Sequence, residues 1–144
     1  MRNRGIEMFE ALTACLPDLE KEESGEWIID KENDGTPEHP KQFAFVDYSD
    51  AAMKVELAIY SIVDNHPELD LSSYKTILEQ HGIDWGLESM TNADVSKLDA
   101  KCVMALLVGA IRADRFCEGA YKSFIDNGSI RRWIERLKEI EECG

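Results

Sequence analysis

Four ionisable side chains form the densest charged cluster within an otherwise apolar stretch of this 144-residue chain: Arg112, Asp114, Arg115 and Glu118. Residues three or four positions apart share one side of a helix, so Asp114, Arg115 and Glu118 would lie together, with Arg112 one turn earlier. Guanidinium groups bind oxyanions through paired hydrogen bonds. One hypothesis is therefore an anion or phosphate site formed by Arg112, Arg115 and Glu118, with Glu118 as a base. The alternative, which we prefer, is an ionic network that locks neighbouring helices.

Cys117 lies inside the same cluster, and neighbouring cations can activate a thiolate. A catalytic cysteine also needs a base. The three histidines fall in unrelated loop or helix-end settings: His39, His66 and His81. We therefore predict a buried structural thiol at Cys117 and no catalytic residue.

The sequence predicts no metal site and no cofactor. No histidine follows another at a spacing of four residues, and the cysteines lack the short paired spacing of a metal or redox site. We expect four reduced thiols, of which the first three are buried and the last is free at the tail: Cys15, Cys102, Cys117 and Cys143. Along one continuous helix, Cys102 and Cys117 would be about 22 Å apart, beyond disulfide reach.

The chain is strongly acidic, with 16 Lys and Arg against 29 Asp and Glu and a formal net charge of -13. This charge disfavours direct binding to nucleic acid or anionic lipid. Residues 101–144 differ, since they hold eight basic and seven acidic side chains. We interpret the acidic excess as a solubilising surface, and mimicry of the charge of a nucleic acid is the alternative.

The apolar runs are too short for a membrane segment. The longest nearly uninterrupted one, Cys102 to Ile111, would cover roughly half of the hydrocarbon layer as a helix. The N-terminus lacks an apolar stretch of signal-peptide length, because Glu7 and Glu10 interrupt it. We therefore expect a cytoplasmic protein without a membrane span.

The N-terminal part predicts one helix and a hairpin. Apolar residues recur at helical spacing over residues 4–16, and residues 18–24 read as an acidic loop. Short aromatic and β-branched segments at 26–30 and 42–47 suit strands, and the turn-rich residues 31–41 between them predict an antiparallel hairpin with a long mobile tip. Trp27, Phe43 and Phe45 would pack onto the helices or present an edge strand to a partner.

The rest of the chain predicts helices. The first begins at Ser49 or Asp50 and ends near His66, and the second is capped by Ser72 or Ser73 and ends at Gly82. Residues 83–97 look irregular. A central apolar helix follows from residue 100 through about 125, with a break near Asp114, and Trp133 anchors the stripe of a last helix over 129–140. We predict a mainly α, single-domain helical bundle over residues 1–144 with a small N-terminal β-hairpin (α+β).

The C-terminal third carries two motifs that resemble a known family. Residues 112–120 read RADRFCEGA, which matches an Arg-x-x-Arg-Phe-Cys-x-Gly pattern, and residues 124–141 read FIDNGSIRRWIERLKEIE, which matches Gly-x-Ile-x-x-Trp-Leu-x-Arg-Leu-Lys with Ile134 in place of Leu. These motifs resemble a family of small, mostly bacterial proteins known as domain of unknown function 6508. The resemblance covers about residues 48–141. It implies a helical fold and supplies no activity.

For function we favour a small non-catalytic interaction or regulatory protein, whose partner would be an unidentified protein. The second hypothesis is an enzyme or binding protein for a phosphorylated small molecule that uses Arg112, Arg115 and Glu118. The third is an acidic mimic of nucleic acid. An open pocket around Arg112 would favour the second hypothesis, whereas an exposed apolar patch would favour the first. The sequence does not indicate an oligomeric state.

Overall fold

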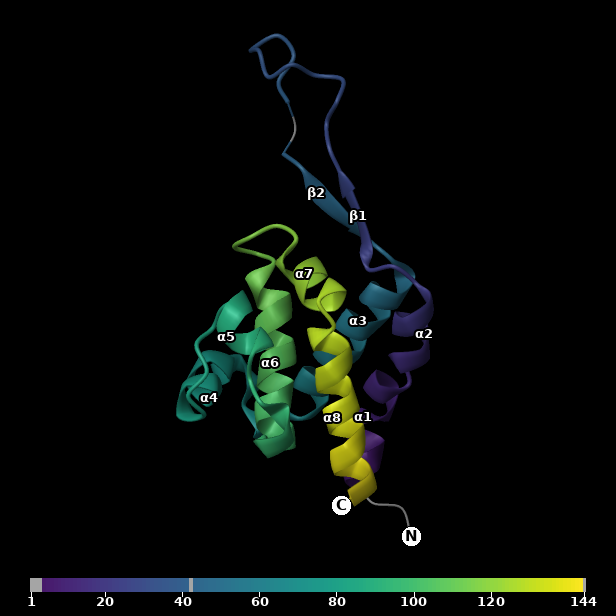
Figure 1. The fold of residues 1–144 in the computed structure, drawn as a ribbon, viewed down its shortest axis with the longest axis vertical. Coiled ribbons are helices and arrows are strands. Elements are labelled where there is room, and N and C mark those ends of the chain that lie inside the picture. Colours follow the sequence, from purple (N-terminus) through teal and green to yellow (C-terminus); the bar gives the residue numbers. More distant parts are fainter. Residues whose placement is uncertain (1–3, 42, 144) are drawn as a thin grey trace.

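The protein is mainly α-helical, with a small two-stranded hairpin near its N-terminus (Figure 1). The computed structural model describes residues 4–41 and 43–143, with the side chains of residues 9–41 and 43–142. The helices are α1 (Arg4–Thr13), α2 (Leu16–Lys21), α3 (Asp50–Asn65), α4 (Tyr74–Gln80), α5 (Leu87–Thr91), α6 (Ala100–Ala113), α7 (Ala120–Asp126) and α8 (Ser129–Cys143). The strands are β1 (Gly25–Ile28) and β2 (Phe45–Tyr48), and short 3-10 helices span Pro67–Leu69, Leu71–Ser73 and Val95–Lys97.

Helix α6 lies at the centre of the bundle. Its residues from Cys102 to Ile111 are buried without interruption, as expected for a helix that is apolar on all sides. Helices α3, α4, α7 and α8 pack against it, and α1 packs along α8 (Figure 1). Trp133 on α8 is fully buried in this core, which confirms its prediction as a core anchor.

Side-chain caps begin two of the helices, and the one at Ser49 was predicted. The Ser49 hydroxyl accepts a hydrogen bond from the Ala52 amide at the start of α3, and the Asp99 carboxylate accepts one from the Cys102 amide at the start of α6. These bonds satisfy amides that have no partner inside the helix. The cap predicted for α4 at Ser72 or Ser73 is wrong, because the residue before this helix, Ser73, makes no side-chain capping bond.

The predicted acidic loop over residues 18–24 is wrong in its first half, because the chain there forms α2. Pro17 lies in the first turn of this helix, where its missing N–H costs nothing, and Asp18 lies beside it. A carboxylate in the first turn interacts favourably with the helix dipole. Proline therefore marks the start of a second helix as well as the end of the first.

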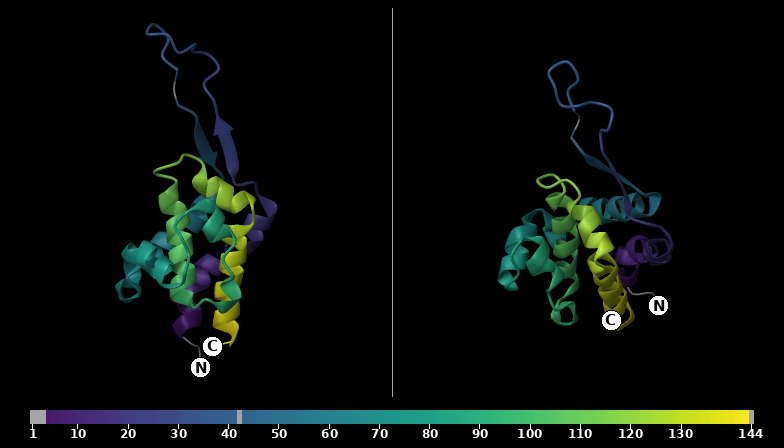
Figure 2. Two further views of the ribbon diagram at one scale, coloured as in Figure 1. Left: turned by 60° about the vertical axis from the view of Figure 1, so that its left-hand side comes forward. Right: turned by 45° about the horizontal axis from the view of Figure 1, so that its top comes forward.

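The hairpin projects away from the bundle, as both views in Figure 2 show. Its strands are antiparallel, with Trp27 opposite Val46 and Ile28 opposite Phe45, and an isolated bridge joins Thr36 to His39 near the tip. We call residues 25–48 the hairpin arm. The predicted second strand began at Gln42, which lies outside the described residues, and β2 begins at Phe45.

The central apolar stretch is divided into two helices at the predicted position. Helix α6 ends at Ala113 and α7 begins at Ala120. We call residues 114–119 the α6–α7 loop, and this loop lies beside the base of the hairpin arm (Figures 1 and 2). No helix in the described part of the chain is long and apolar enough to span a bilayer.

Candidate functional site

The predicted charged cluster falls mainly on the α6–α7 loop. Arg112 is in the last turn of α6, whereas Asp114, Arg115 and Glu118 follow the helix end. The sequence spacing suggested that the four residues share one helix face. They do not, because three of them follow the end of the helix. Among the described residues, no ion pair within 4.0 Å joins any of these four to another. The preferred ionic network is thus wrong, because the helix that would align its members ends at Ala113.

Asp114 organises the loop through hydrogen bonds from neutral donors. Its Oδ1 accepts from the Tyr48 hydroxyl at 2.9 Å and from the amides of Gly119 at 3.0 Å and Tyr121 at 3.2 Å. Burial and the bond to Asp114 raise the pKa of Tyr48, which keeps this hydroxyl protonated and donating. Asp114 therefore joins the loop, the start of α7 and strand β2.

Glu118 attaches the loop to the outer edge of β2. Its Oε1 accepts a hydrogen bond from the Val46 amide at 3.0 Å. Its second oxygen has no hydrogen-bond partner among the described residues. This arrangement covers an amide of the strand edge, and it commits half of the carboxylate that the sequence suggested as a base.

The side chains of Arg112 and Arg115 make no hydrogen bond or ion pair in the described part of the chain, although the Arg115 amide donates to the Arg112 carbonyl at 3.2 Å. The Nε of Arg112 is buried without a partner. Arg115 is exposed and lines a small pocket of about 170 Å³ together with Glu56, Tyr60 and Asp114. Burial and the negative charge of Asp114 raise the pKa of Glu56, and the charge of Arg115 opposes this rise. This pocket places carboxylates of Glu56 and Asp114 beside the guanidinium.

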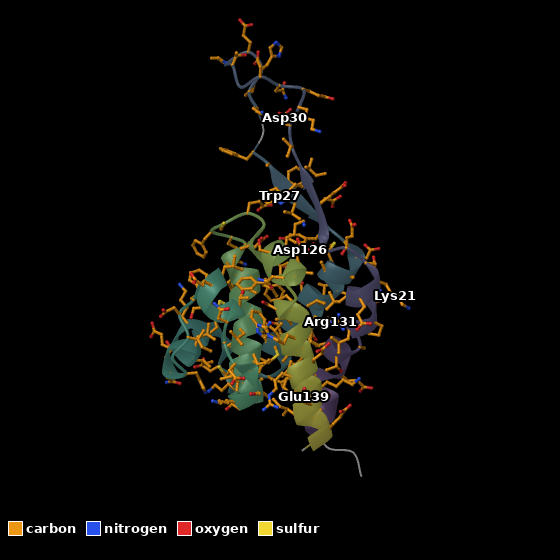
Figure 3. All side chains as sticks on the ribbon, in the orientation of Figure 1. Lys21, Trp27, Asp30, Asp126, Arg131 and Glu139 are labelled. Atoms are coloured by element: carbon orange, nitrogen blue, oxygen red, sulfur yellow. The ribbon has the colours of Figure 1, made fainter. Side chains whose placement is uncertain are left out.

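A third contact fixes the base of the arm to α7. The Ser24 hydroxyl donates to Asp126 Oδ1 at 2.6 Å, and Lys122 Nζ donates to Asp126 Oδ2, also at 2.6 Å. Figure 3 shows Asp126 on α7 below the strands. Together with the bonds of Asp114 and Glu118, this contact gives the arm a defined attachment.

An apolar pocket lies between the arm, the α6–α7 loop and the segment before α5. It encloses about 340 Å³, within the usual range for small-ligand sites. Its lining includes four aromatic rings and one charged side chain: Trp27, Trp85, Phe116, Phe124 and Glu118. Figure 3 shows Trp27 at the base of the arm. We call this cavity the aromatic pocket.

Trp85 is held in a fixed orientation within this pocket. Its Nε1 donates to the Gly109 carbonyl at 2.9 Å, and the ring of Phe116 meets it edge to face at 5.5 Å. Lys75 Nζ lies 4.2 Å from the centroid of its ring. Gly109 is needed here, because a Cβ at this position would crowd Trp85 and Met90. Gly109 thus permits the close packing of Trp85 and Met90 against α6.

Cys117 lines the aromatic pocket and is exposed. The prediction that it is buried is wrong, because the chain leaves the helix before reaching it. Cys15 and Cys102 are free and buried as predicted, and the side chain of Cys143 lies outside the described residues. Within the parts of the chain that the structure describes, no group of His, Cys, Asp and Glu is placed to hold a metal ion.

The hairpin arm exposes large apolar side chains. Phe43 is 97% exposed, Phe45 45% and Trp27 44%. Of the two alternatives predicted for these residues, packing onto the helices is wrong for Phe43 and only partly right for Trp27 and Phe45, which are half-buried. Ile28 and Ile29 are exposed on the same arm, and Phe116 on the adjacent loop is 75% exposed. This end of the molecule therefore presents an apolar, largely aromatic surface.

Sequence reasoning missed the aromatic pocket because its walls come from distant segments. Trp27 precedes Trp85 by 58 positions, and Trp85 lies in a stretch that looked irregular. The one local signal is Gly119, whose φ is +88° and where a Cβ would overlap the indole of Trp27. A glycine is suited to such a position, because it adopts a positive φ without strain and leaves room for another side chain.

A comparison with family models matches residues 6–143 to DUF6508, described as a family of unknown function. This match confirms the resemblance seen in the C-terminal motifs, and it extends further toward the N-terminus than the expected residues 48–141. No curated protein and no solved structure matches the chain.

Proposed function

Because this chain belongs to DUF6508, a family of unknown function, its role has to be argued from its own geometry, and we propose that it is a non-catalytic interaction protein of the cytoplasm. The observation that carries the proposal is the exposure of five large apolar side chains on one arm: Trp27, Ile28, Ile29, Phe43 and Phe45. Contiguous exposed apolar surface of this kind is typical of protein-binding sites.

The attachment of the arm supports a binding role. The bonds of Asp114 to Tyr48, of Glu118 to Val46 and of Asp126 to Ser24 hold its base against the bundle. A partner that binds a preorganised surface pays less conformational entropy than one that must order it first. The arm therefore offers its apolar side chains in a defined direction.

The charge of the arm indicates the chemistry of the partner. Residues 25–48 contain six Asp and Glu against two Lys. Complementary potentials speed association and exclude wrong partners. We expect a partner protein with an apolar cleft bordered by basic side chains.

The test is site-specific photo-crosslinking in cells that naturally produce the protein. A photoreactive phenylalanine analogue replaces Phe43 in one variant and Leu57 in the matched control, since Leu57 is also exposed but lies on α3, outside the arm. The proposal predicts a discrete adduct with another protein from position 43 and none from position 57. It is contradicted by the same adducts from both positions, by no adduct, or by an adduct with only a second copy of the chain.

A second candidate is anion binding by Arg112 and Arg115, with Glu118 as the predicted third member. The absence of ion pairs and hydrogen bonds for both arginine side chains among the described residues favours it. Against it, Glu118 is bonded to Val46, and the pocket beside Arg115 also contains Glu56 and Asp114. We therefore place this candidate second, and it is tested by adding phosphate to the wild type and to Arg115→Ala.

A further inference from the structure

We propose that the aromatic pocket binds a methylated ammonium group, carried either by a small molecule or by a trimethylated lysine of a protein. This inference goes beyond the proposed function, because the pocket lies at the base of the arm and does not need the exposed residues near the tip. Four aromatic rings line the pocket: Trp27, Trp85, Phe116 and the buried Phe124. The face of an aromatic ring attracts a cation, and trimethylammonium groups are bound in this way by aromatic cages.

The charge of the pocket selects a cation over an anion. Glu118 is the one charged side chain among its described lining residues, and one of its oxygens has no hydrogen-bond partner there. The net charge of -13 adds a general attraction for cations. An anionic ligand would meet this carboxylate without any compensating base in the lining.

The scarcity of hydrogen-bond acceptors favours a methylated group over a primary ammonium. A primary ammonium brings three N–H donors, and each must be satisfied when water is removed. The only side-chain oxygens in the described lining belong to Glu118 and Ser123, and one Glu118 oxygen already accepts from the Val46 amide, so three N–H donors would share few acceptors. A trimethylammonium group has no N–H donor, and its methyl groups can pack against the rings.

The rings are positioned before any ligand arrives. Trp85 is fixed by the Gly109 carbonyl and by Phe116, and Trp27 packs closely against Gly119. Lys75 already lies over the ring of Trp85. Trp27 and Phe116 are therefore the rings whose loss should weaken binding most.

The decisive test compares choline with its neutral isostere 3,3-dimethyl-1-butanol and with unmethylated ethanolamine, using tryptophan fluorescence and thermal shift. We expect choline to bind at least tenfold more tightly than either comparison compound. Equal affinities for choline and the neutral isostere would overturn the proposal, because the pocket would then be merely apolar. Equal affinities for choline and ethanolamine would overturn the preference for methylation on which it depends.

Three variants locate the effect. Phe116→Leu removes a ring that is 75% exposed and should reduce choline affinity at least tenfold without unfolding the protein. Glu118→Gln keeps an acceptor for the Val46 amide, and it should weaken choline binding while leaving binding of the neutral isostere unchanged. Leu57→Ala on α3 is the control and should change neither. Undiminished choline binding by Phe116→Leu would place the ligand elsewhere and contradict the proposal.

The source of the group is distinguished by peptides. A short peptide with trimethyllysine is compared with its unmodified lysine form and with free choline. Tighter binding of the methylated peptide than of choline would assign the site to a modified protein, whereas the reverse would assign it to a small molecule. The arm's partner is identified separately by crosslinking at Phe43, so failure of either proposal leaves the other testable.

Discussion

Helix α6 and the hairpin arm both carry apolar residues in quantity, yet the fold treats them in opposite ways. Every residue of α6 from Cys102 to Ile111 is buried. On the described part of the arm, Val46 alone is buried, while aromatic side chains such as Phe43 remain in contact with solvent.

This difference indicates that the apolar residues of α6 stabilise the fold, whereas we propose that those of the arm serve binding. Burial of apolar surface supplies most of the free energy of folding, so substitutions in the bundle should cost stability. The exposed side chains of the arm contribute little to that term. Their exposure to solvent therefore needs another reason, which we propose is recognition of a partner.

The largest effect is expected in the bundle, from Trp133→Ala. Trp133 is fully buried and packs against Phe124 at a centroid distance of 5.5 Å. Emptying such a site typically costs about 3 to 5 kcal/mol. Denaturant titration measures this loss, and Phe43→Ala on the arm is the matched comparison, with an expected change within about 0.5 kcal/mol. Similar losses of unfolding free energy in the two variants would contradict the difference between the bundle and the hairpin arm.

The junction between the two regions should give an intermediate effect, from Gly119→Ala. Both Gly119 and Gly128 have a positive φ, but a Cβ at Gly119 would overlap Trp27, whereas one at Gly128 meets no atom within 4 Å. Left-handed backbone costs either alanine about 1 to 2 kcal/mol. The overlap should destabilise Gly119→Ala by at least about 1 kcal/mol more. Equal losses in denaturant titration would show that Trp27 does not pack there.

Lowering the pH should weaken the attachment of the arm, because Asp126 becomes protonated and loses its bonds to Lys122 and Ser24. Burial alone would raise the pKa of Asp126, but hydrogen bonds from Lys122 and Ser24 outweigh it and lower the pKa below the ordinary value of 3.8. A group with a lowered folded pKa stabilises the fold above its unfolded pKa, and this stability is lost as pH falls through the folded pKa. Asp126 is partly exposed, so the contribution is at most about 1 kcal/mol.

The measurement for this effect is the free energy of unfolding of the wild type and of Asp126→Asn between roughly pH 5 and pH 2. We expect the wild type to lose more stability than the variant over this range. Parallel curves would mean that Asp126 does not carry the effect.

Cysteine reactivity should differ between α6, which contains Cys102, and the α6–α7 loop, which contains Cys117. Burial raises the pKa of Cys102 to about 11, whereas Cys117 is exposed on the α6–α7 loop. In a Cys143→Ser background, a thiol reagent should label one site rapidly, and Cys117→Ser should abolish that labelling. Reducing agent should leave the melting temperature unchanged. Rapid labelling that persists without Cys117 would contradict the exposure of this loop.

The smallest effect is expected from anions at Arg115. If the second candidate were correct, phosphate or pyrophosphate would raise the melting temperature of the wild type, since a ligand that binds only the folded state stabilises it. Arg115→Ala would abolish the rise, while Lys97→Ala on a distant exposed site would retain it. We expect less than one degree of shift in all three proteins. A clear rise that only Arg115→Ala removes would move anion binding to first place.

The helices and the hairpin could be predicted from the sequence because their signals are local. The stripe around Trp133, the cap at Ser49 and the turn-rich residues before β2 each depend on neighbours in the chain. The site could not be predicted in the same way. Asp114 has bonding partners as distant as Tyr48, and Trp85 joins Phe116 across 31 positions, so only the folded chain brings them together.

Residues 112–119, which contain the arginines and Cys117, show in detail why local spacing does not predict the site. Helical spacing over residues 112–118 predicted paired charges, and the lack of a histidine base predicted a buried structural thiol at Cys117. The helix ends at Ala113, because Asp114 accepts the amides of Gly119 and Tyr121 and so stabilises a turn. The hydrogen bonds of Asp114 thus stabilise a loop over residues 114–119, although the spacing of these residues favours a helix.

We propose that the outer part of the hairpin arm, residues 29–44, serves binding and not folding. A variant in which this part is shortened tests the proposal most directly. Since Val46 donates to Glu118, outside the sheet, Trp27 and Val46 form a non-hydrogen-bonded pair, and the next pair, Ile28 and Phe45, is the correct closing pair for a two-residue turn. Residues 29–44 are therefore replaced by Asn-Gly. The free energy of unfolding should stay within about 0.5 kcal/mol of the wild type. A loss of more than about 2 kcal/mol would contradict the claim, because the outer arm would then be part of the folding core.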